Sequence, residues 1–183
     1  MCLWFRSGKE LFEEQTMKIL GLDNGTTGSL AVWDSNLNVM GLHKLPIKKE
    51  LDYTKAVQHI TRIDYPALCE LFTQIKKDTT NDIHVYMEKP FMGGARFIKT
   101  SVNAFRCMES ELVALEECEI GYTVINSKDW QKHILPSGIK GSTELKKASL
   151  DIAKRLYPYL SEKLTKENAD SVLIAHHFKT EMR

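Results

Sequence analysis

The sequence contains no long hydrophobic run. A helix that crosses a membrane needs about 20 consecutive apolar residues, and no stretch of these 183 residues comes close to that length. The apolar residues 1–5 are too few for the core of a signal peptide, and no cleavage-site pattern follows them. We therefore expect neither a membrane-spanning segment nor a secretory signal.

Cysteines are few, and none has the paired spacing of a metal site. The chain has 4 cysteines and no C-x-x-C motif. The 6 histidines are scattered except for the pair His176-His177, so a zinc site has little support. Without a secretory signal beside them, these cysteines indicate reduced thiols in an intracellular protein.

A strong charge of either sign is also lacking. The net charge of +1 does not exclude a nucleic-acid partner, because acidic site residues can offset a basic face. The hydrophobic fraction of 43% and the charged fraction of 27% are typical of a soluble globular protein. We expect residues 1–16 to be a disordered N-terminal extension and residues 17–183 to form one domain.

Apolar segments alternate with turn residues and predict five strands and four helices. The strands are expected at Lys18–Asp23, Ser29–Asp34, Asn38–His43, Ile83–Glu88 and Tyr122–Ile125. The helices are expected from Asp64 onward and over Ser101–Cys118, Leu145–Leu156 and Lys166–Phe178, with an irregular stretch over Lys44–Ile63. This order predicts an α/β fold of ribonuclease H-like type: a mixed five-stranded sheet, an antiparallel meander plus parallel strands, flanked by helices.

Four acidic residues lie where carboxylates are unusual. Asp23 and Glu88 each end an apolar strand, and a carboxylate buried there is unfavourable without a positive partner. Glu167 and Asp170 are spaced i, i+3 on the expected last helix, so both would face the same way. Together the four would form an oxygen-rich pocket suited to Mg²⁺, as in two-metal phosphoryl chemistry.

The segment from Lys89 to Arg106 contains no acidic residue. Its basic residues are interleaved with aromatic ones: Lys89, Phe91, Arg96, Phe97, Lys99 and Arg106. Such a segment suits DNA, since cations hold the phosphate backbone and a ring stacks on a base. Either Lys146 or Lys147 could neutralise a phosphate.

Each motif alone also has an ordinary structural interpretation. Asp23 could cap the turn over residues 24–28, the basic segment could be a solvated loop with core aromatics, and Glu167 with Asp170 could form a solvated acidic face. The alternatives weaken when the motifs are taken together.

In this order and at these intervals, the motifs resemble the RuvC family of Holliday-junction resolvases, particularly the short forms of bacteria and their phages. The resemblance runs from Met17 to about Phe178. It rests on Ile19-Leu20-Gly21-Leu22-Asp23-Asn24-Gly25, on Val85-Tyr86-Met87-Glu88-Lys89-Pro90-Phe91 and on Glu167-Asn168-Ala169-Asp170. The family usually has aspartate where Glu167 stands.

This resemblance implies a homodimeric, Mg²⁺-dependent endonuclease, with Mn²⁺ as a substitute, in the cytoplasm of a bacterial cell or phage-infected host. It would nick two strands symmetrically across a four-way or otherwise branched DNA, leaving a 5′-phosphate and a 3′-hydroxyl. The four acids would hold two metal ions, Lys147 would act near the scissile phosphate, and Phe91 would stack on a junction base.

Three other functions fit parts of the pattern. A non-catalytic nucleic-acid-binding module of the same fold would lack one or more of the acids, and all four are present. A sugar kinase of the actin-like superfamily shares the turn after Asp23, but it needs two lobes and a second phosphate motif. A ribonuclease that cuts RNA–DNA hybrids remains open, because substrate choice is not encoded in these motifs.

Overall fold

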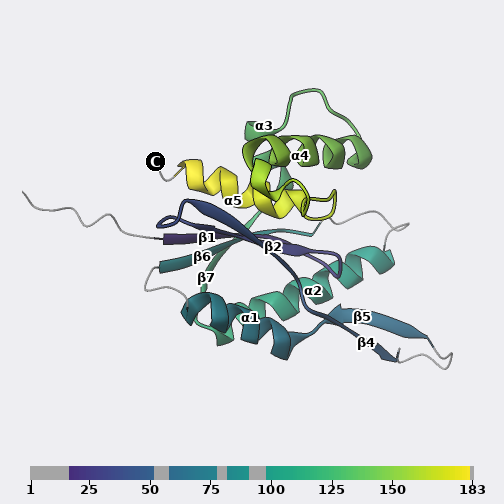
Figure 1. The fold of residues 1–183 in the computed structure, drawn as a ribbon. Coiled ribbons are helices and arrows are strands. Elements are labelled where there is room, and N and C mark those ends of the chain that lie inside the picture. Colours follow the sequence, from purple (N-terminus) through teal and green to yellow (C-terminus); the bar gives the residue numbers. More distant parts are fainter. Residues whose placement is uncertain (1–16, 52–57, 78–81, 91–97, 182–183) are drawn as a thin grey trace, which may run out of the picture.

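A mixed five-stranded sheet forms the centre of the molecule (Figure 1). The computed structural model describes residues 17–51, 58–77, 82–90 and 98–181, so the expectation for residues 1–16 lies outside the described residues. The sheet consists of β1 (Met17–Asp23), β2 (Ser29–Asp34), β3 (Val39–Lys44), β6 (Asp82–Glu88) and β7 (Gly121–Ile125). Their order is β3-β2-β1-β6-β7, antiparallel between β3, β2 and β1 and parallel between β1, β6 and β7. The predicted mixed sheet is confirmed.

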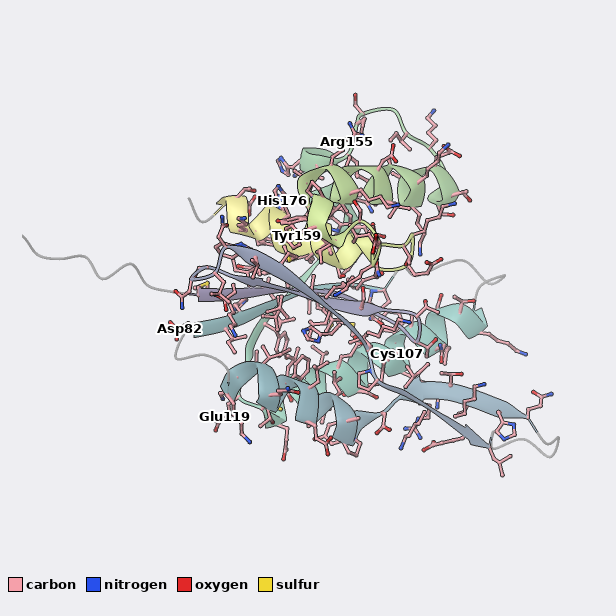
Figure 2. The ribbon with its side chains drawn as sticks, viewed as in Figure 1. Asp82, Cys107, Glu119, Arg155, Tyr159 and His176 are labelled. Atoms are coloured by element: carbon pink, nitrogen blue, oxygen red, sulfur yellow. The ribbon has the colours of Figure 1, made fainter. Side chains whose placement is uncertain are left out.

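Helices cover both faces of this sheet. One face carries α1 (Tyr65–Lys77) and α2 (Ile98–Glu117), and the other carries α3 (Ser127–Ile134), α4 (Ser142–Leu156) and α5 (Ala169–Glu181) (Figure 1). A short 3-10 helix, Pro158–Leu160, follows α4. Side chains fill the space between the sheet and both helical layers (Figure 2).

The central strand β1 is apolar along almost its whole length because both of its faces are covered. Ile19, Leu20 and Leu22 are fully buried, as expected for a strand between two helical layers. Leu20 and Leu22 pack in the core that includes Phe72 of α1. The second core, around Trp130 and the buried residues of α5, lies on the opposite face.

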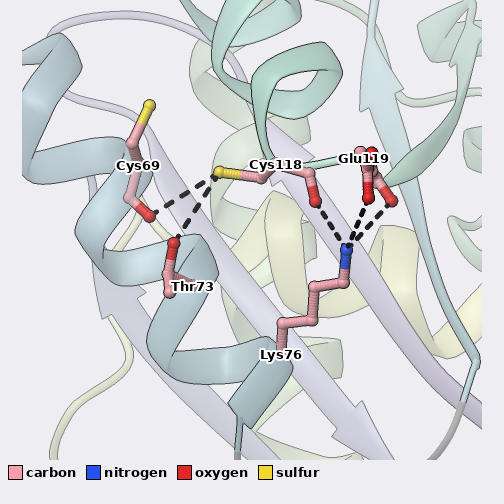
Figure 3. Close-up of polar contacts among 5 residues, drawn as sticks. All are labelled: Cys69, Thr73, Lys76, Cys118 and Glu119. Carbon is pink, nitrogen blue, oxygen red and sulfur yellow. Dashed lines mark hydrogen bonds and ion pairs between the residues drawn. The ribbon is translucent and has the colours of Figure 1, made fainter.

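Polar contacts join α1 to the C-terminal end of α2 (Figure 3). Lys76 Nζ donates to the carbonyl oxygen of Cys118 at 2.8 Å and lies 3.8 Å from the Glu119 carboxylate. The Cys118 thiol contacts Thr73 Oγ1 and donates to the Cys69 carbonyl at 3.7 Å. Since the last carbonyls of a helix have no intrahelical partner, Lys76 stabilises the C-terminus of α2.

Helix α5 lies unusually close to strand β1, and Gly21 permits this approach. A Cβ atom at residue 21 would lie 2.2 Å from the Ser171 carbonyl oxygen and 2.6 Å from the Ala175 nitrogen. The hydroxyls of Ser29 on β2 and Ser171 on α5 are also 2.8 Å apart. The glycine therefore brings the start of α5 next to the end of β1, where the predicted acids lie.

The sequence predicted an irregular stretch over Lys44–Ile63, and this prediction was wrong. It contains an antiparallel hairpin of β4 (Ile47–Leu51) and β5 (His59–Ile63). Polar side chains at both alternating positions of β4 concealed the strand pattern. Glu50 forms an ion pair with Lys48 of its own strand and another with Arg62 on the opposite strand of the hairpin.

Two further differences from the predicted helices are found. The last helix begins at Ala169 and not at Lys166, so Glu167 lies in the turn before it. Helix α3 was not predicted; it is short and begins with a capping box between Asn126 and Asp129. None of the helices in the described ranges is long and apolar enough to cross a membrane.

Candidate active site

Asp23 ends β1 and is followed by a tight turn. Gly25 has a positive φ of 126°, which favours glycine, and the Gly28 amide donates to the Gly25 carbonyl at 2.9 Å. A Cβ atom at residue 28 would lie 2.1 Å from the Asp23 carbonyl oxygen. The glycines thus fold the backbone back on Asp23 and leave its carboxylate at the carboxyl end of the sheet.

Glu88 ends the neighbouring strand β6. Because β1 and β6 are parallel and Leu22 pairs with Met87, the two acids follow adjacent positions at the same edge of the sheet. The two carboxylate oxygens of Glu88 accept hydrogen bonds from Ser127 Oγ and, at 2.9 Å, from Trp130 Nε1. Helix α3, which the sequence did not reveal, therefore orients Glu88.

Asp170 reaches the same edge from the first turn of α5. Its Oδ1 atom is buried and has no hydrogen-bond partner in the described part of the chain. A buried, unpaired carboxylate oxygen is unfavourable. It marks a position where a cation or a donor from outside the chain could bind.

The electrostatics show that these three acids lie together. Burial raises the pKa of Asp23 well above its usual value, and the negative charges of Asp170 and Glu88 raise it further. Burial also raises the pKa values of Glu88 and Asp170. Like charges gathered in a poorly solvated site disfavour ionisation, and a bound cation would restore it.

Glu167 differs from the other three acids. It is exposed, and its backbone amide donates to Thr165 Oγ1 at 3.3 Å; hydrogen bonding to Thr165 lowers its pKa. The helical i, i+3 argument for its pairing with Asp170 was wrong, because only Asp170 lies on α5. Glu167 instead lines a cavity of about 670 Å³ with Thr26, Gly28 and Lys44.

One lysine acts on all four acids. The charge of Lys146, on α4, lowers the pKa values of Asp23, Glu88, Glu167 and Asp170. The sequence itself left Lys146 and Lys147 as alternatives, and the resemblance to the RuvC family favoured Lys147. Lys146 and Lys147 are both exposed, and a role of Lys147 near a phosphate stays a prediction.

The structure adds a fifth acid, Glu111, which the sequence analysis missed. It lies on α2 and is 0% exposed. Its Oε1 accepts a long hydrogen bond of 3.5 Å from the Gly25 amide. The missed signal was its spacing: Glu111 follows the buried Cys107 by four residues and precedes the buried Ala114 and Leu115, so it falls on the apolar face of the helix.

These residues offer the donors that a hard divalent cation prefers, namely carboxylate oxygens. Within the described ranges, no group of three or more acidic, histidine or cysteine side chains is close enough to hold a metal ion as it stands. Both oxygens of Glu88 accept hydrogen bonds, from Ser127 and from Trp130. The donor set of Asp23, Glu88 and Asp170, with the unpaired Asp170 Oδ1, nevertheless fits such an ion chemically.

The predicted DNA-binding residues fall partly outside the described chain. Lys89, directly after β6, and Lys99 and Arg106, on α2, are all exposed. Phe91 and Arg96 lie outside the described residues. Arg106 also borders a cavity of about 420 Å³ between β5 and α2.

The sequence matches no protein-family model and none of the curated proteins. Solved structures do resemble this one. The structure of T. thermophilus RuvC in complex with Holliday junction substrate aligns with a TM-score of 0.58 and 14% identity, over 91% of this chain and 96% of that one.

A second structure, of Thermus thermophilus RuvC, aligns with a TM-score of 0.54 and 13% identity over the same shares of the two chains. A weaker similarity is to the yeast mitochondrial Holliday junction resolvase Ydc2, with a TM-score of 0.43, 17% identity, and 89% and 78% of the two chains covered. The mixed five-stranded sheet flanked by helices thus matches the fold of RuvC. The chain has the ribonuclease H-like fold of RuvC.

Proposed function

We propose that this protein is a Mg²⁺-dependent endonuclease that cuts Holliday junctions and other branched DNA. The observation that carries the proposal is the convergence of Asp23, Glu88 and Asp170 from β1, β6 and α5, with Lys146 beside them. Poorly solvated acids of raised pKa are typical of functional sites. The similarity to a RuvC structure that contains a Holliday junction supports branched DNA as the substrate.

The residues that would hold Mg²⁺, or Mn²⁺ in its place, are Asp23, Glu88 and Asp170, with Glu167 at the exposed side. Two ions bound there would supply activation of a water molecule and neutralisation of the charge that develops on the phosphate and the leaving oxygen. The products would be a 5′-phosphate and a 3′-hydroxyl.

The chain's own residues have three tasks in this scheme. Asp23 and Asp170 provide the negative charge that binds cations. Ser127 and Trp130 fix the orientation of Glu88 by their hydrogen bonds. Lys146, whose charge acts on all four acids, can attract the DNA phosphate to the acidic site.

The DNA would be held beside this site by cationic side chains. Lys89 follows Glu88 directly, and Lys99 and Arg106 are exposed on α2. With Arg96 they would neutralise phosphates, and Phe91 would stack on a base. We further propose a homodimer, because a four-way junction presents two equivalent phosphates related by a two-fold axis.

A comparison of substrates tests the proposal. Purified protein with Mg²⁺ is offered a four-way junction, a flap, a linear duplex and an RNA–DNA hybrid of matched sequence. We expect paired nicks in the junction, weaker cutting of the flap, and little cutting of the duplex or hybrid. Cutting of the hybrid alone would indicate a ribonuclease, and binding without cutting of any substrate would indicate a non-catalytic module.

A further inference from the structure

Glu111 is buried without the partners that a buried carboxyl requires. It lies on α2 with 0% exposure, and its Oε2 has no hydrogen-bond partner among the described residues. Its neighbours on the same helix face are Cys107, Ala114 and Leu115, which belong to the apolar core under α1 and α2. An apolar side chain at this position would avoid the desolvation of a carboxyl. The packing of the core therefore does not explain the glutamate.

The contact that Glu111 does make is with the turn after Asp23. Its Oε1 accepts from the Gly25 amide at 3.5 Å, although the two residues are 86 positions apart in the sequence. Gly25 has a positive φ and its carbonyl accepts from Gly28. Glycine has a wide range of backbone conformations. Without a contact from outside the turn, the backbone after Asp23 could therefore adopt other conformations.

Asn24, between Asp23 and Gly25, adds a second observation. Both polar atoms of its amide, Nδ2 and Oδ1, are buried and unpaired in the described part of the structure. The backbone of the turn thus donates to the Glu111 carboxyl through the Gly25 amide. The unpaired amide of Asn24 lies next to Asp23 in the sequence. The Asn24 side chain therefore makes no hydrogen bond that would hold the turn in place.

We propose that Glu111 is a positioning residue that holds the Asn24–Gly25 turn against α2 and so fixes the direction of the Asp23 carboxylate toward Glu88 and Asp170. This inference rests on the proposed function, since it assigns Asp23 to a cation site. It requires an acceptor oxygen at residue 111 and no charge there. Burial raises the pKa of Glu111 to about 8, and the neutral acid keeps a carbonyl oxygen that can accept from Gly25.

Two substitutions separate the acceptor from the charge. Glu111→Gln keeps an acceptor oxygen of the same shape, whereas Glu111→Leu removes it and fills the space with an apolar group. Binding of Mn²⁺ is measured from the spectrum of the free ion by electron paramagnetic resonance, and the Gly25 amide is followed by nuclear magnetic resonance. The same two changes at Glu109, an exposed residue of the same helix, are the matched controls.

We expect Glu111→Gln to bind Mn²⁺ as the unchanged protein does. Glu111→Leu should lose about 10–100-fold in affinity, as is usual when a residue that orients a metal ligand is removed. It should shift the amide resonances of Asp23, Asn24 and Gly25 while the protein stays folded. Both Glu109 variants should leave affinity and resonances unchanged, and Glu111→Met replaces the leucine variant if that one does not fold.

Two results would overturn the inference. One is Mn²⁺ binding by Glu111→Leu that equals that of the unchanged protein. The other is an equal loss in Glu111→Gln and Glu111→Leu, which would make Glu111 a charged ligand of the ion. Failure of the unchanged protein to bind Mn²⁺ would contradict the proposed function instead. In that case the Gly25 amide resonance alone tests the contact between Glu111 and the turn. The contact predicts a shift of this resonance in Glu111→Leu and none in Glu111→Gln.

Discussion

Asp23 and Asp170 allow the site to be tested with the smallest change of shape. Asparagine is nearly isosteric with aspartate and removes only the negative charge. We expect Asp23→Asn and Asp170→Asn to abolish Mg²⁺-dependent nicking of a four-way junction. Junction affinity should stay largely unchanged, because binding depends on cationic contacts elsewhere. Nicking is measured on labelled junctions and affinity by fluorescence anisotropy.

Asp151 provides the control for this pair. It is an exposed aspartate on α4, and Asp151→Asn should leave nicking unchanged. Near-normal nicking by Asp23→Asn or Asp170→Asn would remove that residue from the site.

Glu111 leads to a prediction about pH and stability. Burial raises its pKa in the folded protein from 4.5 to about 8. Between these values the folded state keeps a proton that the unfolded chain has lost, so rising pH favours unfolding. Without divalent metal, the free energy of unfolding should fall between about pH 5 and pH 8.

Glu111→Gln isolates the share of this fall that belongs to Glu111, since Asp23, Glu88 and Asp170 also have raised pKa values. The variant should lose less stability over that pH range, by at most a few kcal/mol since one pKa unit corresponds to roughly 1.4 kcal/mol. Urea unfolding at several pH values measures the difference. Identical slopes for the variant and the unchanged protein would show that Glu111 does not titrate in this range.

The sequence analysis predicted the acids that end strands more securely than those elsewhere. Asp23 and Glu88 each end an apolar run, so a local pattern identifies them, whereas Asp170 was predicted from a helical i, i+3 pairing with Glu167 that the structure does not contain. Glu111 acquires its role only through Gly25, 86 positions away. Such a contact depends on the packing of α2 against the sheet, which no local pattern encodes.

At the scale of elements, the close contact of α5 with β1 positions the site. Gly21→Ala would place a Cβ atom against the backbone of Ser171 and Ala175. Overpacking of this kind typically costs about 1–3 kcal/mol, and here the obstructing atoms are backbone. We expect lower stability in urea and a loss of nicking, because α5 carries Asp170.

Gly41→Ala is the matched control within the same sheet. A Cβ atom there would meet its nearest neighbour, the Val32 carbonyl oxygen, at 3.7 Å, an ordinary contact. A stability loss in Gly41→Ala as large as that in Gly21→Ala would show that the effect comes from alanine in a strand and not from α5.

Helix α2 carries the prediction for DNA binding. Lys99→Ala and Arg106→Ala should each weaken junction binding whatever the DNA sequence. If each side chain neutralises one phosphate, each substitution should also reduce the slope of log affinity against log salt concentration by about 1. Lys154→Ala on α4, also exposed, serves as the control on the opposite layer. Unchanged affinity and unchanged salt slope in both α2 variants would show that this helix does not face DNA.

The strands of the main sheet were predicted more accurately than the β4–β5 hairpin and helix α3. All five strands of the main sheet were predicted to within one residue at each end, because turn residues bound their apolar segments. The β4–β5 hairpin was missed since it pairs outside the main sheet and carries the charges of Lys48, Glu50 and Arg62. Helix α3 was missed because one buried residue, Trp130, is too little for a helical pattern.

At the scale of the whole molecule, one sheet edge gathers the acids of three elements, and the proposed function gives each chain one active site. A four-way junction needs two cuts related by a two-fold axis. A single chain would have to release the half-cut junction and bind again. Two chains related by the same axis could cut both strands during one encounter.

This symmetry gives the last prediction. On a supercoiled plasmid with an extruded cruciform, the unchanged protein should convert the circle directly to linear DNA, with little nicked circle. Mixing it with an excess of Asp170→Asn protein should increase nicked circles, because a mixed dimer has one competent site. Sedimentation with and without junction DNA should show a dimer. A monomer under both conditions, together with nicked circles from the unmixed protein, would refute paired cutting, since each cut would then come from a separate binding event.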